Sequence, residues 1–553
     1  MNTNKIRAHL ALAAVAGAAL VAACGGGGGG GGIGSGGTGA APGNGLAVGT
    51  VNGFGSIFVG GVRCDDTRAK VSYTTTAGAP AAGVPDVKLG QHVEIVFDPA
   101  GAGCKVLEAM VDPEVVGLVS SVSPLVVAGQ QVAVVTDASV APPTVFEGLA
   151  DAGALKPGDR VEVHGNRLAG GVLQASRIER KPATDTWVRV KGTVSAAGAS
   201  QFTLGALTVK LDGATTFDPA GSTPADGQTV IVWSTGAVAG DGSVTARAVR
   251  VAQRSLDDEQ AVRVEGPVTG CSASPCTTPH VDGLAVDLAG AVWDAGSAAD
   301  VANGASLRVE GTWNAAGSHV VATRASVRSQ DATAADVTLI GMVADYVSGT
   351  SFTVRGVPVT TDGATTFGSG CAVTPGQIVG VKGHVQSSQV VATSVNCLTL
   401  TDGTTLDIFG GLLEVDTTAK TFKLTEGAYK DYTLTWDDDT LFGNGLAGAS
   451  LASGVRVGLR AVLVEGKLLV KRMVADPVPS NLPPGVQVFG NYGIAHDVGA
   501  ASLAVGSITM NIVPGTTTVV GTVVDGTQVR TWFYRTSGSA PWTALQVTQL
   551  VWN

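Results

Sequence analysis

The stretch Val188-Arg189-Val190-Lys191-Gly192-Thr193-Val194 places an apolar residue or a glycine at nearly every second position. Some forty residues later, Gly227-Gln228-Thr229-Val230-Ile231-Val232 begins with a turn glycine and continues as a second apolar run. Period-two alternation bounded by Gly, Asp and Asn is typical of short strands with one buried face. No segment after Asn44 carries the apolar stripe of a helix. The sequence therefore predicts an all-β protein.

The same pattern recurs about every 65 to 80 residues, and each copy holds about five short strands. Five strands in so short a repeat, with a glycine to bend the first, suit a small closed barrel, which removes unpaired strand edges. A propeller is the alternative, but its blades take four strands and about 40 to 50 residues. We predict a tandem array of about seven small five-stranded OB-like barrel modules. The modules are expected over 45–113, 114–182, 183–254, 255–330, 331–402, 403–480 and 481–553.

Residues 1–23 have the pattern of a bacterial signal peptide. Lys5 and Arg7 precede an apolar run over 10–19, which is shorter than the roughly 20 residues of a membrane-spanning helix. The run ends in Leu20-Val21-Ala22-Ala23-Cys24, which resembles the bacterial lipobox, whose cysteine receives a diacylglycerol group. An ordinary signal peptide with a chance cysteine is the alternative. We predict that Cys24 is lipidated. Because Gly rather than Asp follows it, the analogy with enteric lipoproteins indicates the outer membrane.

A glycine-rich segment over 24–44 separates this cysteine from the first module, and it includes eight consecutive glycines over 25–32. It has neither the preceding strand nor the following helix that a phosphate-binding loop requires. Twenty flexible residues have a root-mean-square span of roughly 25 Å. We therefore expect a tether that holds the body away from the membrane, on the periplasmic or the surface side.

The opening of the first module carries a family resemblance. Gly49-Thr50-Val51-Asn52-Gly53-Phe54-Gly55-Ser56-Ile57-Phe58-Val59-Gly60-Gly61-Val62 resembles the start of the DUF5666 domain, which occurs in repeated copies in bacterial envelope lipoproteins. The middle repeats follow this pattern in outline and the last two more loosely. Since the function of the domain is unknown, the resemblance supports the architecture and implies no chemistry.

Six cysteines remain besides Cys24, and their positions indicate one pairing within modules. The predicted disulfides are Cys64–Cys104, Cys271–Cys276 and Cys371–Cys397, which suit an oxidising compartment. A metal site of Cys271, Cys276 and His280 is the alternative, but it lacks an obvious fourth ligand and has an unusual spacing for zinc.

Few motifs carry chemistry. Gly443-Asn444-Gly445-Leu446-Ala447-Gly448 matches a dinucleotide fingerprint but has no βαβ unit around it. Asp437-Asp438-Asp439 is the densest acidic cluster, and oxygen-rich loops can hold Ca²⁺. Equivalent positions at Asp212 and Asp362 have the sequence of ordinary Asx turns. We expect a turn at 437–439, with calcium as the alternative, and no cofactor.

The histidines do not spell a catalytic motif: there is no Gly-x-Ser-x-Gly elbow and no His-Glu-x-x-His. His92, His164 and His384 lie on or at the ends of predicted strands, where we expect solvated or capped side chains. Charges that alternate along strands, such as Arg189 and Lys191, likewise indicate a solvated face.

The overall charge argues against nucleic acid as a partner. Without residues 1–23 the chain has 33 basic and 45 acidic residues, a net charge of −12, and 27 aromatic residues in all. Single-stranded nucleic acids need a basic groove with stacking aromatics. We expect a non-enzymatic lipoprotein that presents repeated modules to an envelope protein or a glycan. The alternative is an envelope enzyme or accessory subunit with a site at a module junction.

Overall fold

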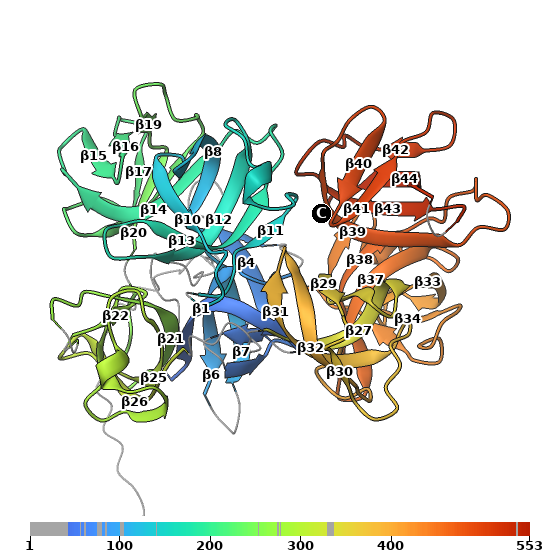
Figure 1. Cartoon of the computed structure of the whole chain (residues 1–553), viewed down its shortest axis with the longest axis horizontal. Helices are drawn as coiled ribbons and strands as arrows, with labels where there is room; N and C mark the ends of the chain where they lie inside the picture. The colour runs from blue at the N-terminus through green and yellow to red at the C-terminus, as the bar shows by residue number, and fades with distance from the viewer. Residues whose placement is uncertain are drawn as a thin grey trace, which may run out of the picture. The chain divides into compact units, whose positions relative to one another are not determined.

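The computed structural model describes residues 43–552 except 56, 60–61, 75–79, 83–85, 100–103, 140, 253, 274–275, 277, 329–336 and 538–539 (Figure 1). The predicted signal peptide, Cys24 and almost all of the tether lie outside the described residues. None of the helical segments in the described part has the length and apolar character of a membrane span.

The first strands close into a ring. β1 (Gly45–Phe54) pairs antiparallel with β2 (Ile57–Val59) and β6 (His92–Asp98), and β2 pairs antiparallel with β3 (Val62–Asp65). β3 runs parallel to β7 (Cys104–Val111), which pairs antiparallel with β6 and completes the circuit. Five strands in this order, with the third and the last parallel, form an OB-like barrel. β4 (Lys70–Thr74) adds to β7 and β5 (Pro80–Ala82) adds to β4.

The same circuit recurs along the chain, and we name each barrel by its first strand. The β8 barrel contains β8 (Val115–Val122), β9 (Leu125–Val127), β10 (Gln130–Val134), β11 (Val145–Glu147), the 3₁₀ turn η1 (Ala152–Ala154), β12 (Arg160–Arg167) and β13 (Leu173–Arg180). The β14 barrel contains β14 (Val188–Ser195), β15 (Gln201–Leu204), β16 (Leu207–Lys210), β17 (Thr216–Asp218), β18 (Thr229–Ser234), β19 (Ser243–Thr245) and β20 (Ala248–Val251).

The β21 barrel contains β21 (Ala261–Thr269), β22 (His280–Val281), β23 (Leu284–Asp287), β24 (Val292–Ala295), η2 (Ala298–Asp300), β25 (Ser306–Asn314) and β26 (His319–Val327). The β27 barrel contains β27 (Val337–Ser348), β28 (Ser351–Val354), β29 (Val357–Thr360), β30 (Thr366–Phe367), β31 (Ile378–Gln386) and β32 (Gln389–Cys397).

The β33 barrel contains β33 (Thr405–Asp416), β34 (Thr421–Leu424), β35 (Leu434–Thr435), β36 (Leu441–Gly443), η3 (Gly448–Ser450), β37 (Arg456–Val464) and β38 (Lys467–Ala475). The β39 barrel contains β39 (Val488–His496), β40 (Ser502–Val505), β41 (Ile508–Asn511), β42 (Thr518–Val520), β43 (Gln528–Tyr534) and β44 (Trp542–Gln549). The predicted all-β class and closed five-stranded barrels are confirmed.

Glycines at bulges let the fourth strand of several barrels bend. Gly165, Gly311 and Gly383 each stand where the register with the last strand shifts. A methyl group on Gly311 would lie 2.1 Å from the Val321 carbonyl oxygen, so no side chain fits there. A bulge raises the local bend and twist. The strand can therefore pair with the first strand at one end and follow the barrel wall at the other.

First strands also join barrels to one another. β1 runs parallel to β21 through Leu46 and Val262, and parallel to β27 through Gly53 and Thr338, while β8 pairs antiparallel with β14. A methyl group on Gly53 would lie 2.5 Å from the Thr338 carbonyl oxygen. The barrels therefore contact through backbone as well as side chains, and sheets of 19 and 13 strands run through more than one barrel.

Candidate functional site

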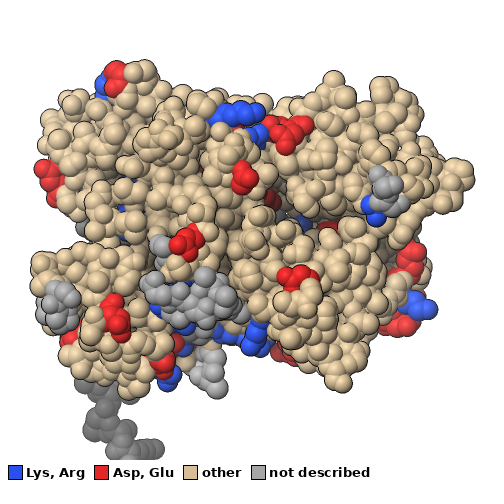
Figure 2. Space-filling view, in the orientation of Figure 1, with Lys and Arg blue, Asp and Glu red and all other residues tan. Residues whose placement is uncertain are grey.

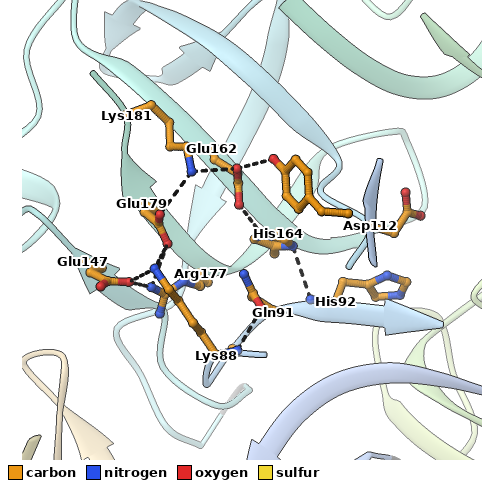
Figure 3. Close-up of polar contacts among 12 residues, drawn as sticks. Lys88, Gln91, His92, Asp112, Glu147, Glu162, His164, Arg177, Glu179 and Lys181 are labelled. Atoms are coloured by element: carbon orange, nitrogen blue, oxygen red, sulfur yellow. Dashed lines mark hydrogen bonds and ion pairs between the residues drawn. The ribbon is translucent and has the colours of Figure 1, made fainter. Parts of the chain in front are cut away.

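Charged side chains gather between barrels. Figure 2 shows only scattered Lys, Arg, Asp and Glu on one face of the molecule. Inside, a first junction network joins the β1 and β8 barrels (Figure 3). It consists of three cations, three carboxylates, a histidine and a tyrosine: Lys88, Arg177, Lys181, Glu147, Glu162, Glu179, His164 and Tyr73.

Glu179 lies at the centre of this network. Its carboxylate meets Lys88 Nζ at 2.9 Å, Arg177 Nη2 at 2.9 Å and Lys181 Nζ at 3.1 Å. Although burial opposes ionisation, these cations, with Lys181 and Lys88 the strongest, hold the pKa of Glu179 well below its usual range. Burial in turn lowers the pKa of Lys88, which Glu179 partly restores. Pairing each buried charge with an opposite charge avoids the cost of an unpaired ion.

Glu162 and His164 resemble the acid–histidine pair of a catalytic site, but their hydrogen bonds are already used. His164 Nε2 lies 2.8 Å from Glu162 Oε1, while the backbone N–H of His92 donates to His164 Nδ1 at 3.3 Å. Because Nδ1 accepts this hydrogen bond, Nε2 is the nitrogen that donates to Glu162. Glu162 also accepts from Tyr73 and contacts Lys181, which holds its pKa at about 2 against the opposing effect of burial. This geometry leaves no nitrogen of His164 free to act as a base.

A second junction network surrounds Asp112, which is 0% exposed. Its carboxylate meets Arg189 and, at 2.9 Å, the ammonium of Lys191. Lys191 also contacts Glu114 at 3.0 Å. Asp112 and Glu114 lie just before β8, the first strand of the β8 barrel, while both cations lie on β14. Burial alone would lower the pKa of Lys191, but Asp112 and Glu114 raise it. The network thus joins the β8 and β14 barrels through charge.

A neighbouring set of ion pairs joins the β21 barrel to the β1 barrel. Arg254 Nη2 lies 2.7 Å from Glu94 Oε1 and 2.6 Å from Asp282 Oδ2, and His92 Nε2 lies 3.4 Å from Asp282 Oδ1. Burial disfavours the charged form of His92, but Asp282 outweighs it and raises the pKa of the imidazole.

These networks correct two expectations. His92 and His164 are 0% exposed, and Arg189 and Lys191 are buried, whereas the sequence predicts solvated or capped histidines and a solvated charged face. These residues do point away from their own barrel cores. The neighbouring barrel covers that outer face, and alternation along a single strand carries no information about it. The sequence does contain one indication of these junctions: Glu94 and Glu162 occupy the same position on the equivalent strands β6 and β12.

A third junction network lies among the β1, β27, β33 and β39 barrels. Arg460 meets Asp407 through both carboxylate oxygens, at 2.7 and 3.0 Å, and Asp86 at 2.8 Å. Arg472 Nε also reaches Asp86 at 2.8 Å. A cleft opens beside these groups, and Asp345 lies in its wall. Burial raises the pKa of Asp345 to about 6.

The remaining residues predicted from sequence are structural where they are described. The structure forms the predicted disulfides Cys64–Cys104, Cys271–Cys276 and Cys371–Cys397. His280 does not join the Cys271–Cys276 pair in a metal site. The stretch from Gly443 to Gly448 runs from the last residue of β36 to the first residue of η3 and is not part of a βαβ unit.

The acidic cluster forms a turn. The Asp437 carboxylate accepts hydrogen bonds from the Asp439 backbone N–H and the Thr440 hydroxyl, and Asp438 pairs with Lys420. Asp212 and Asp362 make the same turn. In the part of the chain that the structure describes, no group of three or more His, Cys, Asp or Glu side chains is arranged to hold a metal ion.

The family model for a domain of unknown function (DUF5666) matches residues 116–179, 191–250, 265–325 and 340–396. The chain carries four DUF5666 domains. They fall within the β8, β14, β21 and β27 barrels, whereas the stretch Gly49–Val62, on which the sequence resemblance rests, lies outside these matches. No curated protein matches the chain.

Proposed function

We propose that this DUF5666 protein is a non-enzymatic envelope lipoprotein, a membrane-tethered scaffold that presents its barrels to a protein or glycan partner. The observation that carries the proposal is the pairing of charge at the junctions. Residues that could do acid–base chemistry, such as Glu162 and His164, are used to join barrels. Ion pairs of this kind favour a fixed arrangement, because a junction that shifted while staying buried would leave a charge without its partner.

The sequence supports the proposed location in the cell envelope. The lipobox-like segment ends at Cys24, and a glycine-rich tether follows it. The disulfides between cysteines of the same barrel suit a compartment outside the cytoplasm. The lipid would anchor the N-terminus in the membrane, and the tether would let the barrels reach a partner away from it. Weak contacts made by several barrels would raise the overall affinity, because each one increases the effective concentration of the others.

Fractionation and cross-linking in the native host test this proposal. The wild-type protein is expected in the outer-membrane fraction, and a Cys24→Ser variant, which cannot be lipidated, is expected to leave it. Cross-linking of intact cells followed by mass spectrometry should recover one reproducible envelope protein or glycan with the wild type. Recovery in the cytoplasm, or equal membrane association of both forms, would contradict the proposal.

A second candidate is an envelope enzyme or accessory subunit with its site at a junction. The observation that favours it is Asp345, a carboxyl group in a cleft with a pKa of about 6, the range suited to a general acid. The two candidates differ in what happens to a captured glycan: a scaffold returns it intact, whereas an enzyme returns it cleaved or modified.

A further inference from the structure

The cleft beside Asp345 has in its wall a buried hydroxyl group without a hydrogen-bond partner among the described residues. This hydroxyl belongs to Tyr492 on β39. The hydroxyl lies against the backbone of Gly458, where a methyl group would come within 2.2 Å of it. Burial raises the pKa of Tyr492, so the hydroxyl keeps its proton. A buried donor without a partner costs free energy unless a ligand or water satisfies it.

Asp345 supplies a second polar group, which has hydrogen-bonding capacity left over. Its carboxyl accepts one hydrogen bond, from Thr353 Oγ1 at 3.2 Å, and within the described residues it forms no ion pair. Asp345 has a left-handed backbone (φ 42°) at a register shift between β27 and β28. The shift breaks the regular pairing of the strand beside the cleft.

The charges of the cleft cancel. Arg460 is engaged by Asp407 and Asp86, and Arg472 by Asp86. Arg530, whose guanidinium group lies over the rings of Phe409 and Tyr492, is engaged by Asp476. A bound anion would compete with these carboxylates for the guanidinium groups, and it would also approach Asp345. A ligand without net charge fits this balance better than a phosphate or a carboxylate.

The rest of the wall is apolar. Phe409 stacks on Tyr492 with ring centroids 5.9 Å apart, and Trp552 brings a third aromatic side chain to the cleft. Pockets for small ligands combine apolar walls with a few polar groups. This cleft is small, which favours a single ring over an extended chain.

We propose that this cleft binds one uncharged sugar residue, with hydroxyl groups of the sugar satisfying Tyr492 and Asp345 and its apolar C–H face packing against the aromatic wall. A sugar hydroxyl both donates and accepts hydrogen bonds, as the tyrosine hydroxyl and the carboxyl require. The inference rests on the proposed function and deepens it, because it names a neutral glycan end as the ligand class.

Saturation-transfer NMR and titration with the full chain test the inference. The probes are glucose, galactose, mannose and N-acetylglucosamine, with glucuronate as the anionic and glucosamine as the cationic comparison, each at about 20 mM. A single sugar ring is expected to bind with a Kd of about 1 mM. Tyr492→Phe removes only the hydroxyl and is expected to weaken binding about fivefold to tenfold. Tyr432→Phe, on an exposed tyrosine of the β33 barrel away from the cleft, is the matched control.

Two further variants guard against a loss through misfolding. Asp345→Asn keeps the shape of the side chain, and Gly458→Ala fills the space beside the Tyr492 hydroxyl. Both should weaken the binding of the same neutral sugar at least fivefold, while the circular dichroism spectrum stays that of the wild type. Saturation transfer to no neutral sugar would overturn the inference, as would binding that Tyr492→Phe leaves unchanged or a preference for glucuronate or glucosamine. If cross-linking still captured an envelope partner, the proposed scaffold role would stand without the sugar site.

Discussion

Replacing Asp112 by Asn tests whether buried charge joins the barrels. Asp112 is 0% exposed, and its carboxylate meets Arg189, also 0% exposed, and Lys191. Asparagine has nearly the same volume and can still accept one hydrogen bond, so packing hardly changes. The variant leaves two buried cations on β14, with Glu114 as the remaining carboxylate within 3.0 Å of Lys191.

The expected cost is about 4 kcal/mol of local stability. Removing one partner of a buried ion pair costs about 3–5 kcal/mol, and here a single carboxylate serves two cations. Hydrogen exchange measured by mass spectrometry on peptides that cover β8, β14 and β18 gives the free energy of opening at this junction. Asp294→Asn is the matched control, because Asp294 pairs with Arg324 at an exposed site where side chains are 46% and 57% exposed. Its expected effect is below about 1 kcal/mol.

A loss of less than about 1 kcal/mol with Asp112→Asn would refute the reasoning. It would mean that the junction relaxes and admits water, so that the pair contributes no more than a surface ion pair. If the free energy of opening fell in peptides of β14 but in no peptide of the β8 barrel, the charge would stabilise β14 alone and would not join the two barrels.

Other predictions concern a carboxyl group, a bulge and the disulfides. The pKa of Asp345 is raised from 3.8 to about 6 by burial, so the folded state binds a proton more tightly than the unfolded state, and its ionisation should lower stability by about 3 kcal/mol as the pH rises from 4 to 7. Asp345→Asn should therefore raise Tm at pH 7.5 and leave it nearly unchanged at pH 4; an equal Tm difference at both values would contradict this. Gly311→Ala, whose added methyl would lie 2.1 Å from a carbonyl oxygen, should lower the unfolding free energy of the β21 barrel by about 2–4 kcal/mol. Gly290→Ala in the same barrel has nothing within 4 Å and should change stability by less than about 1 kcal/mol; equal effects in urea unfolding would count against the bulge argument. Replacing Cys64 and Cys104 by Ala opens a loop of 40 residues and should cost about 4 kcal/mol, whereas replacing Cys271 and Cys276 opens a loop of 5 and should cost about 2 kcal/mol. The reverse order in urea titrations would contradict the loop-length argument.

Much of the barrel architecture could be predicted from sequence because its determinants are local. Val188, Val190 and Val194 alternate into their own core, and Gly227 adopts the positive φ that the turn before β18 requires. Spacing alone also brings Cys64 and Cys104 into one barrel, where their strands β3 and β7 run parallel.

The junctions could not be predicted in this way. Whether Arg189 meets water or Asp112 depends on which barrel covers the outer face of β14, and partners 77 residues apart leave no periodic signal. The cleft has the same origin, since Asp345, Asp407 and Tyr492 come from different barrels and each belongs to an ordinary strand pattern. Contacts between closed barrels are therefore the part of this fold that strand periodicity does not encode.

The most direct test of the scaffold account measures the distance between two barrels in solution. Spin labels on cysteines introduced at the exposed positions Lys156 in the β8 barrel and Ser200 in the β14 barrel allow double electron–electron resonance on the full chain. The account predicts one narrow distance distribution that broadens when Asp112→Asn is added. A broad distribution in the parent protein, unchanged by that substitution, would mean that the barrels move independently and would contradict the account.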